Sequence, residues 1–170
     1  MAAILLPSMA HAVTPAATAR IVKRHDQMVE SLLNQQITDP VSAWCGGYPD
    51  NFGIVQPQSA GRIVNAFTAG FLHPQSKFYK DTLLLTRIRL ASEHLDRRQN
   101  ENGNIDLMIT NFNSPPDTAF LVHSVASAAN VARLHGEKQL VATTQRFLTR
   151  AGAALATGGG AAADRRWRGR

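Results

Sequence analysis

Residues 118–134 constrain the fold of this chain most, because they would form a helix that is apolar on nearly every side. Directly before them, Ser114-Pro-Pro-Asp117 has the pattern of a helix N-terminus, with a capping serine and prolines in the first turn. A helix without a polar face is buried on most of its circumference. We therefore expect other helices to surround residues 118–134, and we expect Gly136 to end this helix.

Four other segments have apolar residues at the spacing of a helix. The first begins at Thr14-Pro15, with the threonine as its cap, and ends at residues 38–40. Ser59 and Ser76 would cap the next two, and the last follows Gly136. No stretch alternates for long enough to predict a strand, although residues 107–109 are suited to a short one. The sequence thus predicts an all-α fold of antiparallel helical hairpins, arranged in an inner and an outer layer.

With 170 residues the chain is long enough for one domain, which we place at residues 14–157. Residues 1–13 include Ala10-His-Ala12, which has the spacing of a signal-peptidase site, but they lack a basic segment. They are either a signal remnant or the start of the domain, so a cytoplasmic and an exported location both stay open. Residues 158–170 are rich in arginine and have no periodicity. We expect them to be a basic tail that is disordered, or the aberrant end of a truncated or frame-shifted chain.

The composition excludes several classes of protein. The single cysteine, Cys45, rules out an internal disulfide and a cysteine-based zinc cluster. The histidines lie in separate elements and no cofactor motif is present, so we expect neither a metal nor a cofactor. No run approaches the roughly 18 apolar residues of a membrane span, and we expect no membrane association. The net charge of +6 suits an acidic polysaccharide as well as nucleic acid.

One long polar loop, residues 99–116, separates the third and fourth predicted helices. A connection of this length without regular structure is more often functional than neutral. Its Asn111 and Asn113 lie two positions apart, so in an extended segment both side chains point toward one ligand. Alternatively, both residues form turns through hydrogen bonds to their own backbone. A second loop, residues 41–53, carries Trp44 and Tyr48, each of which either contacts a ligand or fills the core.

Three stretches of the sequence resemble bacterial heparinase II/III-like proteins: Trp44-Cys-Gly-Gly-Tyr48, Gly103-Asn-Ile-Asp106 and Thr110-Asn-Phe-Asn-Ser-Pro-Pro-Asp-Thr-Ala-Phe120. The resemblance covers residues 28–159 and implies an α/α toroid of the polysaccharide lyase type. Because such a toroid has more helices than this sequence predicts, the resemblance is to its N-terminal half. In those proteins we expect a segment with His and Asn before an Arg-Trp pair. Here Gly160-Ala-Ala-Ala-Asp-Arg-Arg-Trp167 has neither, which predicts a fragment and leaves its own activity open.

β-Elimination at a uronic acid requires a group that neutralises the carboxylate, a base for the C5 proton and an acid for the leaving oxygen. Amides can do the first, and a tyrosine or a histidine can do the second. The catalytic candidates are Tyr48, Asn111, Asn113 and His123. The substrate-binding candidates are Trp44, Asp50, Asp106 and Asp117. For His123 the alternative is a core histidine, and for Asp117 it is a helix cap.

We therefore expect an acidic oligo- or polysaccharide as the partner, and we expect no nucleic acid. Two alternatives stay open. A glycoside hydrolase on the same toroid, acting on unsaturated uronides, would use Asp50 and Asp106 as its pair of carboxylates. A helical binding module without catalytic activity would instead hold a protein or a nucleic acid on its basic surface.

Overall fold

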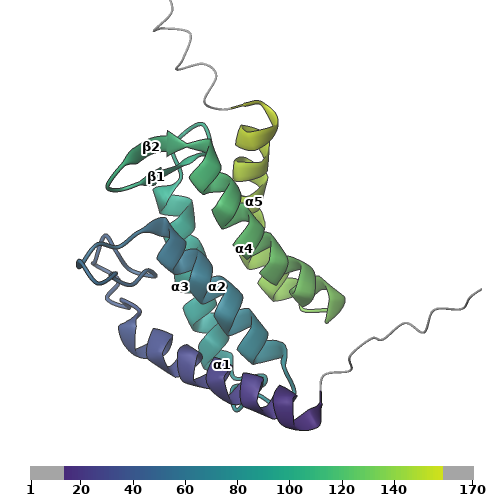
Figure 1. Cartoon of the computed structure of the whole chain (residues 1–170). Helices are drawn as coiled ribbons and strands as arrows, with labels where there is room; N and C mark the ends of the chain where they lie inside the picture. Colours follow the sequence, from purple (N-terminus) through teal and green to yellow (C-terminus); the bar gives the residue numbers. More distant parts are fainter. Residues whose placement is uncertain (1–13, 159–170) are drawn as a thin grey trace, which may run out of the picture.

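The computed structural model describes residues 14–158, in which five helices and one two-stranded sheet are formed (Figure 1). The elements are α1 (Pro15–Gln35), α2 (Pro57–Leu72), α3 (Thr82–Arg98), β1 (Ile105–Leu107), β2 (Asn111–Ser114), α4 (Pro115–Leu134) and α5 (Lys138–Ala156). The helical class predicted from the sequence is confirmed. The predicted signal remnant at residues 1–13 and nearly all of the basic tail, residues 159–170, lie outside the described residues. None of the helices within 14–158 is long and apolar enough to cross a membrane.

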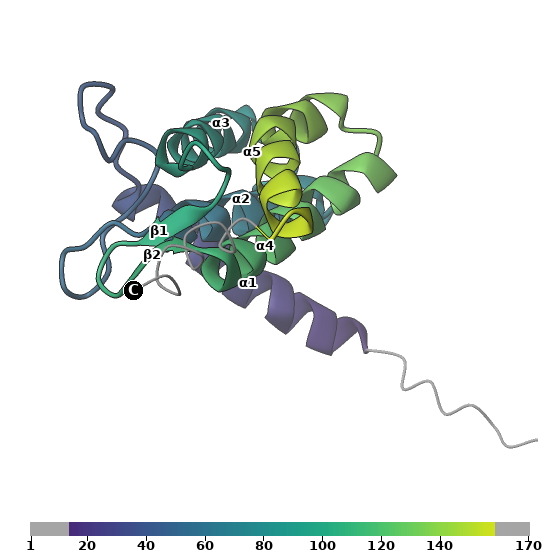
Figure 2. The ribbon, with the colours of Figure 1, turned by 90° about the horizontal axis from the view of Figure 1, so that it is seen from above.

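The helices form two stacked layers. Helices α2 and α3 form one antiparallel hairpin, α4 and α5 form the next, and the two hairpins pack through α2 against α4 and through α3 against α5. Viewed from above, α3 and α5 lie on one side of the molecule, α2 and α4 lie next to them, and α1 covers the other side of α2 (Figure 2). The largest fully buried side chains come from several of these helices: Ile63, Phe67, Leu84, Ile88, Leu95 and Phe147.

The most buried helix is α2, and the prediction that residues 118–134 are surrounded is wrong. Twelve of the sixteen residues of α2 are buried. Helix α4 buries one face, while Phe120 is 76% exposed and Leu134 is 86% exposed. The reason is that α4 packs mainly against α2 and α5, which cover the side that carries Leu121, Val125 and the buried alanines and leave the other side open.

Two of the predicted helix starts are confirmed. The Thr14 hydroxyl accepts a hydrogen bond from the Ala17 N–H, and α1 begins at the proline between them. The Ser114 hydroxyl accepts a hydrogen bond from the Asp117 N–H at the start of α4. In both cases the cap and the following proline are adjacent in sequence, so the signal is local.

The other two predicted caps are wrong, because long-range contacts occupy those serines. Helix α2 begins at Pro57, so Ser59 lies in its first turn and its hydroxyl accepts a hydrogen bond from the Tyr48 N–H. Helix α3 is capped by Asp81. The Ser76 hydroxyl instead donates to the buried Asp26 carboxylate at 2.6 Å.

The polar segment 99–116 is not an open loop but contains an antiparallel hairpin. Ile105 pairs with Ser114 and Leu107 pairs with Asn111, with an irregularity between the pairs. The predicted short strand at residues 107–109 is therefore displaced to residues 105–107. Asn113 has a φ of 52°, a left-handed conformation that interrupts the alternation of a strand. The expectation that Asn111 and Asn113 point the same way because they are two apart thus does not apply.

Candidate functional site: the loop face

Two connections meet at the end of the molecule where α2 and α4 begin (Figure 1). One joins α1 to α2, and the other is the hairpin between α3 and α4. They are linked directly, because the Met108 N–H donates a hydrogen bond of 2.9 Å to the side-chain oxygen of Gln56. We call residues 44–56 and 99–117 the loop face. It contains all of the predicted site residues except His123.

The first connection is fixed to α3 through its backbone carbonyls. Arg97 donates to the Cys45 carbonyl at 2.6 Å, and Arg98 donates to the Ala43 carbonyl at 2.9 Å. The guanidinium of Arg98 also lies 3.9 Å from the centre of the Trp44 ring. This cation–π contact covers one side of the ring, so only the rest of Trp44 is open to a ligand.

His94 lies beneath this connection and is fully buried. Its Nδ1 is 3.1 Å from the Cys45 carbonyl, and burial lowers the pKa of His94 to about 4. Gly46 makes the close approach to α3 possible. It has a φ of 97°, and a Cβ atom there would lie 2.0 Å from the Leu90 carbonyl oxygen. The pair of glycines in the Trp-Cys-Gly-Gly-Tyr stretch is thus explained by packing, and Cys45 is a buried thiol.

Tyr48 and Asp50 lie on the connection between α1 and α2 and also stabilise it. Tyr48 is half-buried and packs against the core. The carboxylate of Asp50 is exposed and accepts hydrogen bonds from the Phe52 N–H at 2.8 Å and the Ile54 N–H at 3.0 Å. Asp50 therefore stabilises the turn that follows it.

The hairpin is anchored on α5. The Gln99 side-chain amide donates to the Gly103 carbonyl at 2.9 Å and to the Phe147 carbonyl at 3.1 Å. Arg150 donates to the Asn100 carbonyl at 2.8 Å. Gly103 has a φ of 90°, and a Cβ atom there would lie 2.3 Å from the Arg150 carbonyl oxygen, so only glycine lets the hairpin base come this close to α5.

Asp106 and Asn113 are bound to each other and to the hairpin. One Asp106 carboxylate oxygen accepts from the Asn100 side chain at 2.8 Å and from the Asn113 N–H at 2.7 Å. The Asn113 side-chain oxygen accepts from Asn102 at 2.7 Å. These two predicted site residues therefore stabilise the turn. No hydrogen bond or ion pair connects Asp106 with Asp50 in the described part of the chain.

Asn111 and Asp117 are the predicted polar residues that lie more openly at the surface. Asn111 is exposed, and its side-chain nitrogen is 3.4 Å from an Asp117 carboxylate oxygen. The same oxygen accepts a hydrogen bond from the Ser114 hydroxyl. Asp117 thus has the structural role that its position suggested, in the first turn of α4. Its carboxylate also lies next to the exposed side chain of Asn111.

His123 lies on the exposed side of α4 and is not a core histidine. Among residues 14–158, no hydrogen bond joins the side chains of His123 or Tyr48 to Asn111 or Asn113. The structure therefore brings the two loops together but does not join a candidate base to the amides by direct contact.

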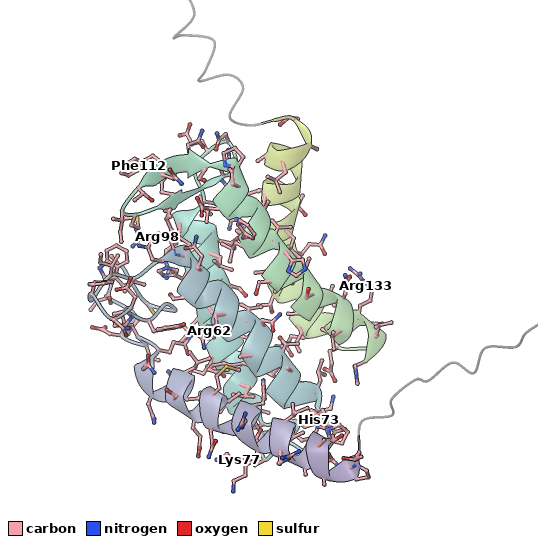
Figure 3. The ribbon with its side chains drawn as sticks, in the orientation of Figure 1. Arg62, His73, Lys77, Arg98, Phe112 and Arg133 are labelled. Carbon is pink, nitrogen blue, oxygen red and sulfur yellow. The ribbon has the colours of Figure 1, made fainter. Side chains whose placement is uncertain are left out.

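Sequence reasoning missed the exposed aromatic residues at this end of the molecule. Phe112 is 72% exposed on the hairpin, where Figure 3 labels it, and Phe52 is exposed on the other connection. Phe120 extends from the first turns of α4. Large aromatic side chains at the surface mark interaction sites more often than isolated aliphatic ones. The signal was available in the sequence, since Phe112 stands between two asparagines in a polar segment.

Charges of both signs meet at the loop face, which itself carries the carboxylates of Asp50, Glu101, Asp106 and Asp117. The N-termini of α2 and α4 lie at it and carry partial positive charge, although both helices begin with proline and the Asp117 N–H is already bound by Ser114. Arg97 and Arg98 add two full charges at its edge. Within residues 14–158, no three His, Cys, Asp or Glu side chains are grouped in a way that could hold a metal ion.

Comparison of the sequence with models of known protein families, with curated proteins and with solved structures gives no match.

Proposed function

We propose that this protein binds acidic, uronate-containing saccharides at the loop face, as the recognition part of a polysaccharide lyase-like protein. One observation carries the proposal. Two connections that are far apart in sequence form one surface at the helix N-termini, linked by the Gln56–Met108 hydrogen bond, and that surface combines amides, carboxylates and open aromatic rings. Amides and carboxylates bind sugar hydroxyls, aromatic rings stack on sugar rings, and helix N-termini favour carboxylates.

Rigidity supports this proposal. A binding surface gains affinity when its groups are already held in place before the ligand arrives. Here His94, Arg97 and Gly46 fix one connection on α3, while Gln99 and Arg150 fix the hairpin on α5. The polar loops therefore rest on two helices of the same layer.

We also propose that the fold is a segment of an α/α toroid, the N-terminal half that the resemblance implies. Two stacked antiparallel hairpins, with α2 and α4 in one layer and α3 and α5 in the other, are the repeating unit that such a ring needs. In that arrangement both connections of the loop face emerge at the same end of the ring.

For the chemical step we propose β-elimination, with Asn111 neutralising the uronate carboxylate. Tyr48 takes the C5 proton as the C4–O4 bond breaks and the C4=C5 double bond forms, and it returns that proton to the departing O4. Tyr48 is the stronger candidate for the base because it lies on the loop face, while His123 lies along the outside of α4. An elimination creates ultraviolet absorbance from the unsaturated uronide, and an unsaturated-uronide hydrolase removes it. Following that absorbance with each type of substrate distinguishes the two reactions.

The binding proposal is tested by calorimetric titration of the full chain with tetrasaccharides of hyaluronan, alginate, heparin and oligogalacturonate. We expect binding of at least one of them, weakened by about threefold to tenfold in Phe112→Ala and in Asn111→Ala. Leu134→Ala and Asn130→Ala are matched controls, because both positions are exposed and lie toward the other end of α4.

The titration can also contradict the proposal. Binding of none of the four saccharides by the folded chain would refute it. Equal effects of the loop-face variants and the α4 controls would place the site elsewhere. Binding of a nucleic acid in place of any saccharide would favour the helical binding module.

A further inference from the structure

A groove runs along α2 between α1 and α4, starting just below the loop face. It has a volume of about 270 Å³ and is lined by α1, by Gln58, Arg62 and Asn65 of α2, and by Phe120 and Ser124 of α4. Gln58 is two residues beyond Gln56, whose side chain binds the hairpin. A second hollow of about 260 Å³ shares Asn65 and continues the same seam between α2 and α4. A saccharide of several units on the loop face would extend into this groove.

Arg62 is the charged residue of the groove and has no carboxylate partner among residues 14–158. Figure 3 shows it extending from α2 toward α1, where its Nη2 is 3.8 Å from the Met28 sulfur. A thioether is a weak acceptor, so the guanidinium keeps nearly all of its capacity to donate hydrogen bonds. No acidic side chain lines this groove or its continuation.

The neighbours of Arg62 are suited to a sugar. The Asn65 side-chain nitrogen donates to the Ser124 carbonyl at 3.0 Å, which orients its amide oxygen as an acceptor. The side-chain oxygen of Gln58 is buried and has no hydrogen-bond partner in the described part of the chain. Phe120 presents an exposed ring along the same groove. A guanidinium, two amides and an aromatic ring are together able to bind a carboxylate, hydroxyls and the apolar side of a pyranose.

A larger hollow, about 570 Å³ beside α1, lacks this character. It is lined by Asp26, Lys23, Glu30 and Lys77, and Lys77 forms an ion pair with Glu30. Its charges are of both signs and are already paired in part, so an anionic ligand would meet two carboxylates there. The groove at Arg62 has a cation without such competition.

We propose that the groove is the carboxylate subsite of the saccharide site: Arg62 binds a uronate carboxylate of the bound chain, Gln58 and Asn65 bind its hydroxyls, and Phe120 stacks on its ring. This inference rests on the proposed function and names the part of the surface that selects an acidic sugar over a neutral one. Arginine suits this role because its planar guanidinium can donate two parallel hydrogen bonds to one carboxylate.

The test compares two ligands and two arginines. The full chain is titrated with the uronate tetrasaccharide that binds best and with the same tetrasaccharide after reduction of its carboxyl groups. Arg62→Gln is expected to weaken binding of the acidic ligand about tenfold and to leave binding of the reduced ligand unchanged. Arg133→Gln is the matched control, because Arg133 is exposed on the last turn of α4, where Figure 3 labels it, and bonds to Asn130.

Phe120→Ala provides a second test, with Leu134→Ala as its control on the same helix. We expect about threefold weaker binding of both ligands from Phe120→Ala, because stacking does not depend on the carboxylate. Circular dichroism of each variant verifies that the helices are intact.

The outcomes separate this inference from the proposed function. If the wild-type chain binds the acidic ligand and Arg62→Gln binds it equally well, the subsite is refuted while the loop-face proposal stands. If Arg62→Gln weakens both ligands equally, Arg62 does not recognise the carboxylate. If inorganic sulfate displaces the acidic ligand at the same concentration as free galacturonate does, the groove is a general anion site. If the wild-type chain binds no saccharide, both proposals fail.

Discussion

Acidification is predicted to weaken the fold through His94. Its side chain is fully buried beneath the loop face, and burial lowers its pKa to about 4 from 6.5, with Arg97 and Arg98 acting in the same direction. The unfolded chain therefore binds a proton between these two values that the native chain does not bind. Stability consequently falls as the pH drops through this range and is fully present above 6.5.

The magnitude follows from the two pKa values. A difference of one in pKa corresponds to about 1.4 kcal/mol. Because His94 gains its proton mainly in the unfolded state, the free energy of unfolding is lower by about 3 kcal/mol at pH 4 than at neutral pH. That is a large part of the stability of a domain this size, which is about 5–15 kcal/mol. Burial also lowers the pKa of His25, which adds to the loss, and raises the pKa of Asp96, which opposes it. A His94 variant is needed to separate these effects.

Urea unfolding at several pH values, followed by circular dichroism, measures the effect. His94→Gln keeps a donor for the Cys45 carbonyl and has no proton to gain, and Arg97 still binds that carbonyl. We expect the wild type to lose about 3 kcal/mol relative to this variant between pH 7 and pH 4. If the difference between the two proteins is the same at both pH values, His94 is not held neutral beneath the loop.

Three further predictions concern how the loop face is held. Gly46→Ala should destabilise the protein by about 3 kcal/mol, seen as a lower melting temperature, because its φ is 97° and the new Cβ would meet the Leu90 carbonyl; an unchanged melt would contradict the described turn. Ser114→Ala should cost about 1 kcal/mol in urea unfolding by removing the cap of α4, whereas no loss would show that Asp117 N–H has another acceptor. Asp106→Ala should speed amide hydrogen exchange in the hairpin without changing exchange in α2, and equal protection in both proteins would argue against its turn role.

The parts of the fold that the sequence predicted are those set by neighbouring residues. Thr14 and Ser114, each followed by proline, give the starts of α1 and α4. Ser59 and Ser76 are not followed by proline, and their hydroxyls bind residues in other segments of the chain, Tyr48 and Asp26. Those contacts exist only after folding, but the missing proline after each serine, and Pro57 at the true start of α2, were local signals against these two caps.

Burial was harder to predict than helicity. Residues 118–134 are apolar all round, yet α4 buries Ala128, Ala129 and Ala132 and leaves Phe120 and Leu134 at the surface. Helix α2 looked amphipathic because Arg62 and Asn65 interrupt its apolar residues, yet these two line the groove between α1 and α4. The sequence indicated that the two loops matter, but only the fold places Arg62 beside them.

Among the predicted site residues, local hydrogen bonds decided which remain open to a ligand. Asp50 and Asp106 accept hydrogen bonds from backbone N–H groups of their turns, and the side chain of Asn113 is bound by Asn102. Asn111 stays exposed. A sequence cannot separate these cases, because whether an amide faces its own backbone or the solvent depends on a left-handed residue such as Asn113 and on the register of the hairpin.

The most direct measurement of the central claim is a two-dimensional NMR titration of the isotope-labelled chain with a uronate tetrasaccharide. We predict that the amide shifts cluster at residues 44–56 and 99–117, extend to the Asn65 side chain, and are absent at the opposite end around residues 73–77. Shifts confined to residues 73–77, or no shifts at saturating saccharide, would contradict the assignment of the loop face as a saccharide-binding surface.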